Sequence, residues 1–148
     1  MQERFEAFTV LINRISRNIR KIKSQEISAF NLKSAHISCL YYLYKNDGLT
    51  ATELCEHCEE DKAAISRSLD YLEKNCYIVC DSQHAKRYKS PFSLTDKGRK
   101  VGKEIIDKIN EILDEVGTGI TQEERIAFYR SLSIISDSLD TIANNWGK

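Results

Sequence analysis

The side chains whose types and spacing suggest chemistry lie between residues 62 and 72. Ile65, Leu69 and Leu72 are separated by four and three residues, which predicts a helix that buries these side chains on one face. The opposite face would carry small or polar side chains, namely Lys62, Ala63, Ser66, Arg67 and Asp70. Small residues allow a helix to approach the edges of DNA bases, and Ser and Arg can hydrogen bond to those edges. An ordinary solvated helix face has a similar composition, so the choice between a DNA-binding face and a solvated face depends on the neighbouring segments.

A short helix is expected immediately before this one. Thr50 and Glu53 have the spacing of a capping box, in which each side chain accepts a hydrogen bond from the backbone N–H of the other residue. Three carboxylates follow at residues 59–61, and carboxylates are favourable near the start of a helix. The two helices and their short connection therefore have the pattern of a helix-turn-helix.

Two short extended segments follow the second helix. Residues 77–81 are rich in strand-forming side chains, and residues 90–94 form a second run in which Pro91 indicates an edge strand. Three basic side chains lie between the two segments: Lys86, Arg87 and Lys89. A basic hairpin tip beside a helix-turn-helix is typical of a wing, which can place Arg or Lys on phosphates or in a minor groove.

The order and separation of these segments resemble the winged-helix DNA-binding domain of the MarR family of transcriptional regulators. Three segments carry the resemblance: Leu49-Thr50-x-x-Glu53-Leu54, Asp61-Lys62-x-x-Ile65-Ser66-Arg67-x-x-Asp70-x-Leu72-Glu73-Lys74, and Leu94-Thr95-Asp96-Lys97-Gly98-Arg99. The resemblance implies a mainly α fold with a small β-wing, in which a winged helix-turn-helix is flanked by long N- and C-terminal dimerisation helices. Residues 1–148 would form a single MarR-like domain, with a dimerisation arm (1–30), the winged helix-turn-helix (34–98) and dimerisation helices (99–148).

Three positions depart from the family pattern. Cys76 stands where the family usually has Gly after the recognition helix. Lys86 and Tyr88 stand where the wing usually has an Asp and an Arg that brace it, which leaves Arg87 as the remaining wing-tip arginine. Without the usual Asp and Arg, a rigid wing and its insertion in the minor groove are less strongly predicted than the domain itself.

Apolar stripes on the flanking helices predict a homodimer. A stripe with spacings of three and four runs along the N-terminal segment: Phe5, Phe8, Ile12, Ile15, Ile19 and Ile22. Similar stripes follow on a helix from Asp96 to about Val116, capped by Thr95, and on a last helix after a capping box of Thr121 and Glu124. These stripes exceed what one small winged helix can bury, which disfavours the alternative of a compact helical monomer. A two-fold dimer would place two recognition helices about one DNA turn apart on a palindromic site.

The sequence therefore predicts a sequence-specific regulator that binds double-stranded DNA, in the form of a ligand- or signal-responsive repressor. The residues expected near bases are Ala63, Ala64, Ser66 and Arg67. The residues expected on phosphates or in the minor groove are Lys62, Lys86, Arg87 and Lys89. The formal net charge of the chain is zero, but residues 62–103 hold ten basic and four acidic side chains, and such a local basic excess suits phosphate contact.

An effector site is implied by the resemblance, because many members of the family bind a small, often aromatic, acid between the dimer helices and the DNA-binding lobe. The candidates for lining such a cleft are Ile15, Ile19, Cys39, Tyr41, Tyr42 and Tyr44. Core and dimer packing is the alternative role for the tyrosines, which belong to a helix that Asn31 or Ser34 is expected to cap.

The cysteines suggest a reducing compartment. There are five of them, an odd number in a chain without a recognisable secretion signal, so we expect free thiols in a cytoplasmic protein. Four superficially match a zinc spacing: Cys55, Cys58, Cys76 and Cys80. The first pair falls inside a predicted helix, so core packing is favoured, and neither these cysteines nor the scattered His36, His57 and His84 are assigned to a metal.

Cys76 is instead the candidate for thiol-based redox sensing, because its expected position after the recognition helix would let oxidation push on that helix. Signatures of an enzyme, such as a Gly-rich phosphate loop or a nucleophile elbow, are not found, and no cofactor is expected. No apolar run is long enough to cross a bilayer. The alternative from another class is a winged-helix module that binds proteins without specific DNA binding.

Overall fold

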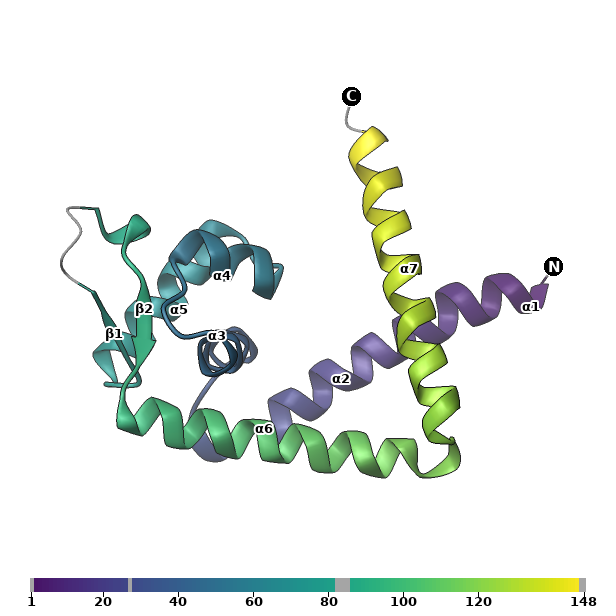
Figure 1. Cartoon of the computed structure of the whole chain (residues 1–148), viewed down its shortest axis with the longest axis horizontal. Helices are drawn as coiled ribbons and strands as arrows, with labels where there is room; N and C mark the ends of the chain where they lie inside the picture. Colours follow the sequence, from purple (N-terminus) through teal and green to yellow (C-terminus); the bar gives the residue numbers. More distant parts are fainter. Residues whose placement is uncertain (1, 27, 82–85, 147–148) are drawn as a thin grey trace. The chain divides into compact units, whose positions relative to one another are not determined.

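A computed structural model describes residues 2–26, 28–81 and 86–146 of the chain (Figure 1). The chain forms two compact units, residues 1–106 and residues 107–148. Helices dominate both units, and the first also contains one two-stranded antiparallel sheet. The predicted fold class, mainly α with a small β-wing, is therefore confirmed.

The helices follow one another closely along the chain. They are α1 (Gln2–Phe5), α2 (Ile12–Glu26), α3 (Ser34–Lys45), α4 (Ala51–Cys58), α5 (Lys62–Lys74), α6 (Asp96–Val116) and α7 (Gln122–Trp146). A π-helical segment, η1 (Glu6–Leu11), joins α1 to α2, and short 3-10 turns are η2 (Ser28–Phe30), η3 (Arg87–Lys89) and η4 (Gly117–Gly119). The bounds of α6 agree with the sequence prediction, whereas the π-helical segment has no counterpart in it.

The capping predictions for α4, α6 and α7 are confirmed. Thr50 and Glu53 form the capping box of α4, in which the backbone N–H of Thr50 donates to Glu53 Oε2 at 2.8 Å. The hydroxyl of Thr95 accepts from the N–H of Gly98 in the first turn of α6. A second capping box, formed by Thr121 and Glu124, begins α7. These contacts satisfy amides that a helix start would otherwise leave without partners.

The predicted cap of α3 is wrong. Ser34 is already helical, Asn31 has a left-handed φ of 56°, and Lys33 occupies the cap position. The Lys33 side chain does not make the hydrogen bond that caps the helix; instead, its backbone N–H donates to Nδ1 of His36 at 3.0 Å. A hydrogen bond from the cap residue to a histidine inside the helix therefore stands where the sequence analysis expected an Asn or Ser side chain to cap the first turn.

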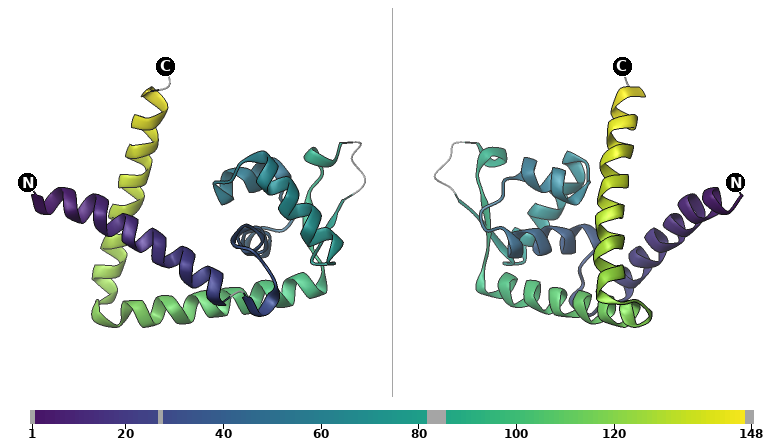
Figure 2. Two further views of the ribbon diagram at one scale, coloured as in Figure 1. Left: turned by 180° about the vertical axis from the view of Figure 1, so that it is seen from behind. Right: turned by 45° about the vertical axis from the view of Figure 1, so that its right-hand side comes forward.

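The wing consists of β1 (Ile78–Cys80) and β2 (Phe92–Leu94), which pair antiparallel with Ile78 opposite Leu94. Both strands are shorter than predicted. Ahead of β2, Pro91 cannot donate to a ladder and η3 occupies the chain. The N–H of Phe92 donates to the carbonyl of Leu49, so the residue before α4 also pairs with the wing. Figure 1 and both views in Figure 2 show this hairpin beside α4 and α5.

The core of the first unit lies between α3, α4, α5 and the hairpin. Its most completely buried side chains, each at most 2% exposed, are Ile37, Cys39, Leu40, Leu43, Leu54, Ile65, Leu69, Leu72, Ile78 and Phe92. Full burial of one such Leu or Ile side chain is favourable by roughly 1.5–3 kcal/mol. The predicted inward face of α5 is therefore confirmed, and this packing fixes which face of α5 points outward.

The terminal helices expose apolar side chains. On the predicted N-terminal stripe, Phe8, Ile12, Ile15 and Ile19 are exposed, while the side chain of Phe5 lies outside the described residues. On α7 the exposed apolar side chains are Ile126, Phe128, Tyr129, Leu132, Ile134, Leu139, Ile142 and Trp146. Over residues 2–26, 28–81 and 86–146, no helix combines the length and the apolar character needed to span a membrane.

Candidate nucleic-acid interface

The outward face of α5 carries the side chains that the sequence analysis placed on it. Lys62, Ala63, Ser66 and Arg67 are exposed, and Ala64 is half-buried. Because the opposite face is anchored in the core, these side chains form one small, polar and partly basic surface. Such a surface has the composition that close approach to base edges requires.

The start of α5 is fixed by Asp61. Its Oδ1 atom accepts a hydrogen bond of 2.7 Å from the N–H of Ala64, which defines Asp61 as the N-cap. Asp61 was predicted only as one of three favourable carboxylates. The sequence signal for the N-cap role of Asp61 is its position directly before Lys62, the first residue of the polar face.

The end of α5 is closed by a Schellman motif. The N–H of Cys76 donates to the carbonyl of Glu73 at 3.0 Å, and the N–H of Tyr77 donates to that of Leu72 at 2.8 Å. Cys76 has a φ of 62°, in the left-handed region that glycine adopts without strain. This conformation is the physical reason why a glycine suits the position.

A junction ties this turn to the start of α6. The hydroxyl of Thr95 lies 2.6 Å from the carbonyl oxygen of Cys76, and Nζ of Lys97 donates to the carbonyl of Asn75 at 2.8 Å. Lys97 also lies over the ring of Tyr77, 4.1 Å from its centroid. The end of α5, the start of β1 and the start of α6 are thus joined by hydrogen bonds at one point.

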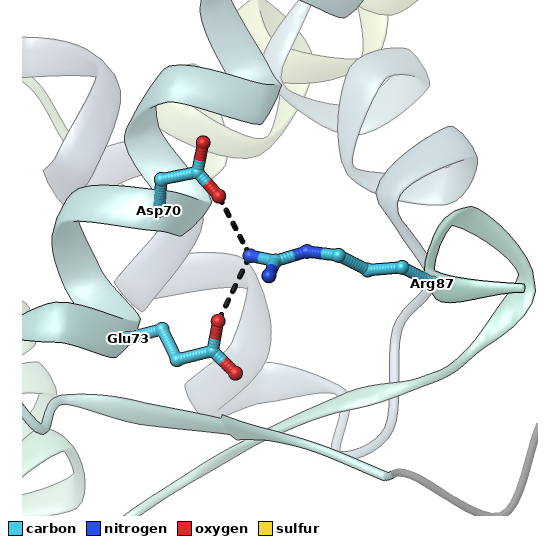
Figure 3. Close-up of polar contacts among 3 residues, drawn as sticks. All are labelled: Asp70, Glu73 and Arg87. Atoms are coloured by element: carbon cyan, nitrogen blue, oxygen red, sulfur yellow. Dashed lines mark hydrogen bonds and ion pairs between the residues drawn. The ribbon is translucent and has the colours of Figure 1, made fainter.

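Arg87 connects the wing to α5 (Figure 3). Its Nη2 atom lies 2.7 Å from Oδ1 of Asp70 and 2.8 Å from Oε2 of Glu73. The sequence analysis assigned Arg87 to DNA and did not identify either carboxylate as its partner. The available signal was the three-residue spacing of Asp70 and Glu73, which places both carboxylates on one side of a helix.

The remaining basic residues of the wing flank this contact. Lys86 and Lys89 are exposed, and the N–H of Lys89 donates to the carbonyl of Lys86 at 3.0 Å. The hydroxyl of the buried Ser90 also donates to that carbonyl. The return arm of the wing is therefore folded on itself, while residues 82–85, which include His84 and the rest of the predicted tip, lie outside the described residues.

The candidate effector residues have separate surroundings. Ile15 and Ile19 are exposed on α2, whereas Cys39 is fully buried in the core, so it could reach a ligand only if its neighbours moved. Three half-buried tyrosines of α3 complete the set: Tyr41, Tyr42 and Tyr44.

Those tyrosines face different partners. The rings of Tyr41 and Tyr42 meet edge to face, and Tyr42 also stacks on His57. Tyr44 lies against Gly102, where an added Cβ would stand 3.1 Å from its ring. These contacts suit packing, and a common ligand cleft remains a prediction.

The cysteines also differ in environment. A hydrogen bond with Cys58 and burial both raise the pKa of the Cys39 thiol, and the same bond lowers the pKa of Cys58. Burial raises the pKa of Cys55. Cys76, the candidate for redox sensing, is exposed. Among the described residues, no group of three or more His, Cys, Asp or Glu side chains is arranged to hold a metal ion.

Solved structures that this fold resembles include regulators of the MarR family. A MarR family transcriptional regulator from Silicibacter pomeroyi is 28% identical, with a TM-score of 0.76 over 84% of this chain and 84% of that chain. MarR from Staphylococcus aureus, in complex with salicylate and kanamycin, is 19% identical, with a TM-score of 0.81 over 95% of this chain and 92% of that chain. MepR from S. aureus, in a complex with DNA, is 21% identical, with a TM-score of 0.77 over 89% of this chain and 97% of that chain.

A search of curated proteins found no match. A family model described as a winged helix DNA-binding domain matches residues 35–113, which is more than half of the chain. The matched segment contains most of α3, all of α4 and α5, the β1–β2 hairpin and most of α6. The resemblance inferred from the sequence is thereby confirmed: the chain belongs to the winged helix DNA-binding domain family and has the fold of the MarR regulators.

Proposed function

We propose that the protein is a transcriptional repressor that binds double-stranded DNA as a homodimer on a palindromic operator. The observation that carries the proposal is the outward face of α5, where exposed Ser66 and Arg67 lie beside a wing that is ion-paired to the same helix. Ser66, Arg67, Ala63 and Ala64 approach base edges, while Lys62, Lys86 and Lys89 contact phosphates. The family to which the chain belongs supports DNA binding.

The homodimer rests on the exposed apolar side chains of the terminal helices. Ile15 and Ile19 of α2 are 51% and 48% exposed, and Ile126 and Ile142 of α7 are 61% and 47% exposed. Apolar stripes of this length are unfavourable in water and are covered in obligate dimers. Residues 1–30 and 99–148 are therefore proposed to contribute the dimer interface, with residues 34–98 of each copy facing one operator half-site.

A small aromatic or amphipathic effector is proposed to regulate DNA binding. Salicylate is present in the complex of S. aureus MarR, whose fold this chain shares. In this chain the half-buried Tyr41, Tyr42 and Tyr44 of α3, with Ile15 and Ile19 of α2, offer aromatic and aliphatic surface to such a molecule. Cys39 would join them only after a rearrangement, since it is fully buried.

A second, thiol-based signal is suggested by Cys76. The side chain is exposed and its backbone has a left-handed φ at the end of α5. A peroxide would transfer one oxygen atom to the thiol sulfur, giving a sulfenic acid and releasing water or an alcohol. The added polar atom at the junction that joins α5 to α6 would displace the recognition helix. We propose a cytoplasmic, non-enzymatic regulator in either case.

Fluorescence anisotropy tests the proposed function. A labelled duplex from upstream of the protein's own gene is titrated at low and at physiological salt, and a scrambled duplex is the comparison. Preferential binding of the upstream duplex that is lost in Arg67→Ala is the expected result. Equal, weak and salt-sensitive binding of both duplexes would contradict it and favour a winged-helix module that binds proteins.

A further inference from the structure

Arg87 holds the return arm of the wing against α5 (Figure 3). A single nitrogen, Nη2, lies within 2.8 Å of an oxygen of Asp70 and of an oxygen of Glu73. The carboxylates are three residues apart on α5, so one guanidinium can reach both across a single turn. The contact joins the wing to a residue seventeen positions earlier in the chain.

The guanidinium of Arg87 also lies near a buried residue of the wing. Its Cζ atom lies 5.9 Å from the centroid of the Phe92 ring, and Phe92 is 1% exposed at the start of β2, where it pairs with Cys80. The guanidinium is thus placed between a buried wing residue and the side of α5. Because the three charged side chains are 34–64% exposed, the ion pairs add little to folding stability, and their consequence is the position of the wing.

The charges near the proposed DNA surface explain why this arginine is needed there. Asp70 lies on the same exposed face of α5 as Ser66 and Arg67. A carboxylate on this surface repels phosphate, and Glu73 adds a second negative charge one turn away. If Arg87 left them to contact DNA, both carboxylates would remain uncompensated beside the phosphate backbone.

We propose that Arg87 is a positioning residue that clamps the wing to the recognition helix and shields DNA from Asp70 and Glu73. It is not one of the phosphate or minor-groove contacts, and that role falls to its neighbours Lys86 and Lys89. The effect of Arg87 on DNA affinity rests on the proposed DNA-binding function. The clamp between the wing and α5 does not, because it is present in the protein without DNA. It replaces the brace that the altered wing positions 86 and 88 would otherwise supply.

Hydrogen exchange of the protein without DNA tests the clamp directly. The reporters are the amides of Asp81, Lys89 and Ser90, which donate to Pro91, Lys86 and Arg87 in the wing. Arg87→Met removes the charge and keeps an unbranched apolar side chain, and the double variant Asp70→Asn/Glu73→Gln keeps the shape of both partners. Both variants are expected to speed exchange at these three amides several-fold, while core amides of α3 exchange as in the wild type. Unchanged exchange in both variants would overturn the clamp.

A double-mutant cycle on DNA affinity tests the role in binding. Arg87→Met is measured in the wild-type background and in the Asp70→Asn/Glu73→Gln background. A positioning role predicts a loss of roughly five- to tenfold in the first background and less than about twofold in the second, because the partners are already neutral. Arg67→Met is the matched control, since it also removes one positive charge, in this case from α5. Its loss of DNA affinity is expected to be similar in both backgrounds.

A direct phosphate contact makes the opposite prediction. Arg87→Met would then cost as much or more in the neutral background, and the slope of log affinity against log salt would fall there by about one. That result would overturn the proposal. If no variant, including the wild type, binds any duplex, the proposed function fails, whereas the exchange measurement still decides whether the clamp exists.

Discussion

The carbonyl oxygen of Tyr77 occupies the space that a Cβ atom on Gly98 would need. Gly98 lies in the first turn of α6, where its N–H donates to the hydroxyl of Thr95, and Thr95 in turn contacts the turn after α5. A glycine is required because the backbone of the wing passes directly against α6. The close approach thereby fixes where the chain entering β1 lies relative to the start of α6.

Gly98→Ala is therefore expected to destabilise the protein by at least about 2 kcal/mol, since backbone must move to admit the methyl group. Urea unfolding followed by circular dichroism measures the change. Gly119→Ala is the matched control, because nothing lies within 4 Å of its Cβ position, and it should alter stability by less than about 1 kcal/mol. Equal midpoints for the two variants would contradict the packing described for Gly98.

Cys76→Gly is expected to stabilise the protein. Cys76 has a φ of 62°, which costs a residue with a Cβ roughly 1–2 kcal/mol, and glycine adopts it without that cost. Part of the gain is offset by the greater freedom of glycine in the unfolded chain, so the net increase should be about 0.5–1 kcal/mol. Thermal melting of this variant beside Cys76→Val, which should be less stable than wild type, provides the comparison. A Cys76→Gly variant that melts below the wild type would argue against strain at this turn.

Local rules explain why much of the fold could be predicted from sequence. The spacing of Ile65, Leu69 and Leu72 determines the buried face of α5, and the Thr50–Glu53 pair determines where α4 begins. Both features depend on residues within one or two helical turns of each other, so periodicity and capping chemistry were sufficient to predict them.

The parts that were missed depend on contacts between residues distant in sequence. Arg87 was assigned to DNA because its ion pairs with Asp70 and Glu73 exist only once the wing folds against α5. The cap of α3 was misplaced because His36, a residue with no strong capping preference, accepts the bond from Lys33. The spacing of Asp70 and Glu73 places both carboxylates on one side of α5, but it does not say which basic residue pairs with them, because that is decided by packing.

Lys89→Ala is expected to weaken binding to every duplex by a similar factor. The proposed role of Lys89 is a phosphate contact, which carries no sequence information. The slope of log affinity against log salt should fall by about one, while the ratio between upstream and scrambled duplexes stays the same. Arg67→Ala provides the contrast, since loss of a base contact should cost roughly 1–3 kcal/mol and reduce that ratio. A Lys89→Ala variant that changes the preference between duplexes would refute the assignment to phosphate.

Acidification should destabilise the first unit through His36. Burial, with a smaller contribution from the positive charge of Lys33, lowers the pKa of His36 from its ordinary value of 6.5. The folded state therefore binds fewer protons than the unfolded state at pH values between the lowered pKa and 6.5, so stability falls as pH decreases through that window. Protonation also removes the acceptor for the Lys33 N–H and charges a ring that stacks on Tyr71 at 4.3 Å. His36→Asn keeps an acceptor oxygen and cannot titrate, so the free energy of unfolding measured from pH 7.5 to 5 should depend less on pH in this variant. The same pH dependence in variant and wild type would place the titrating group elsewhere.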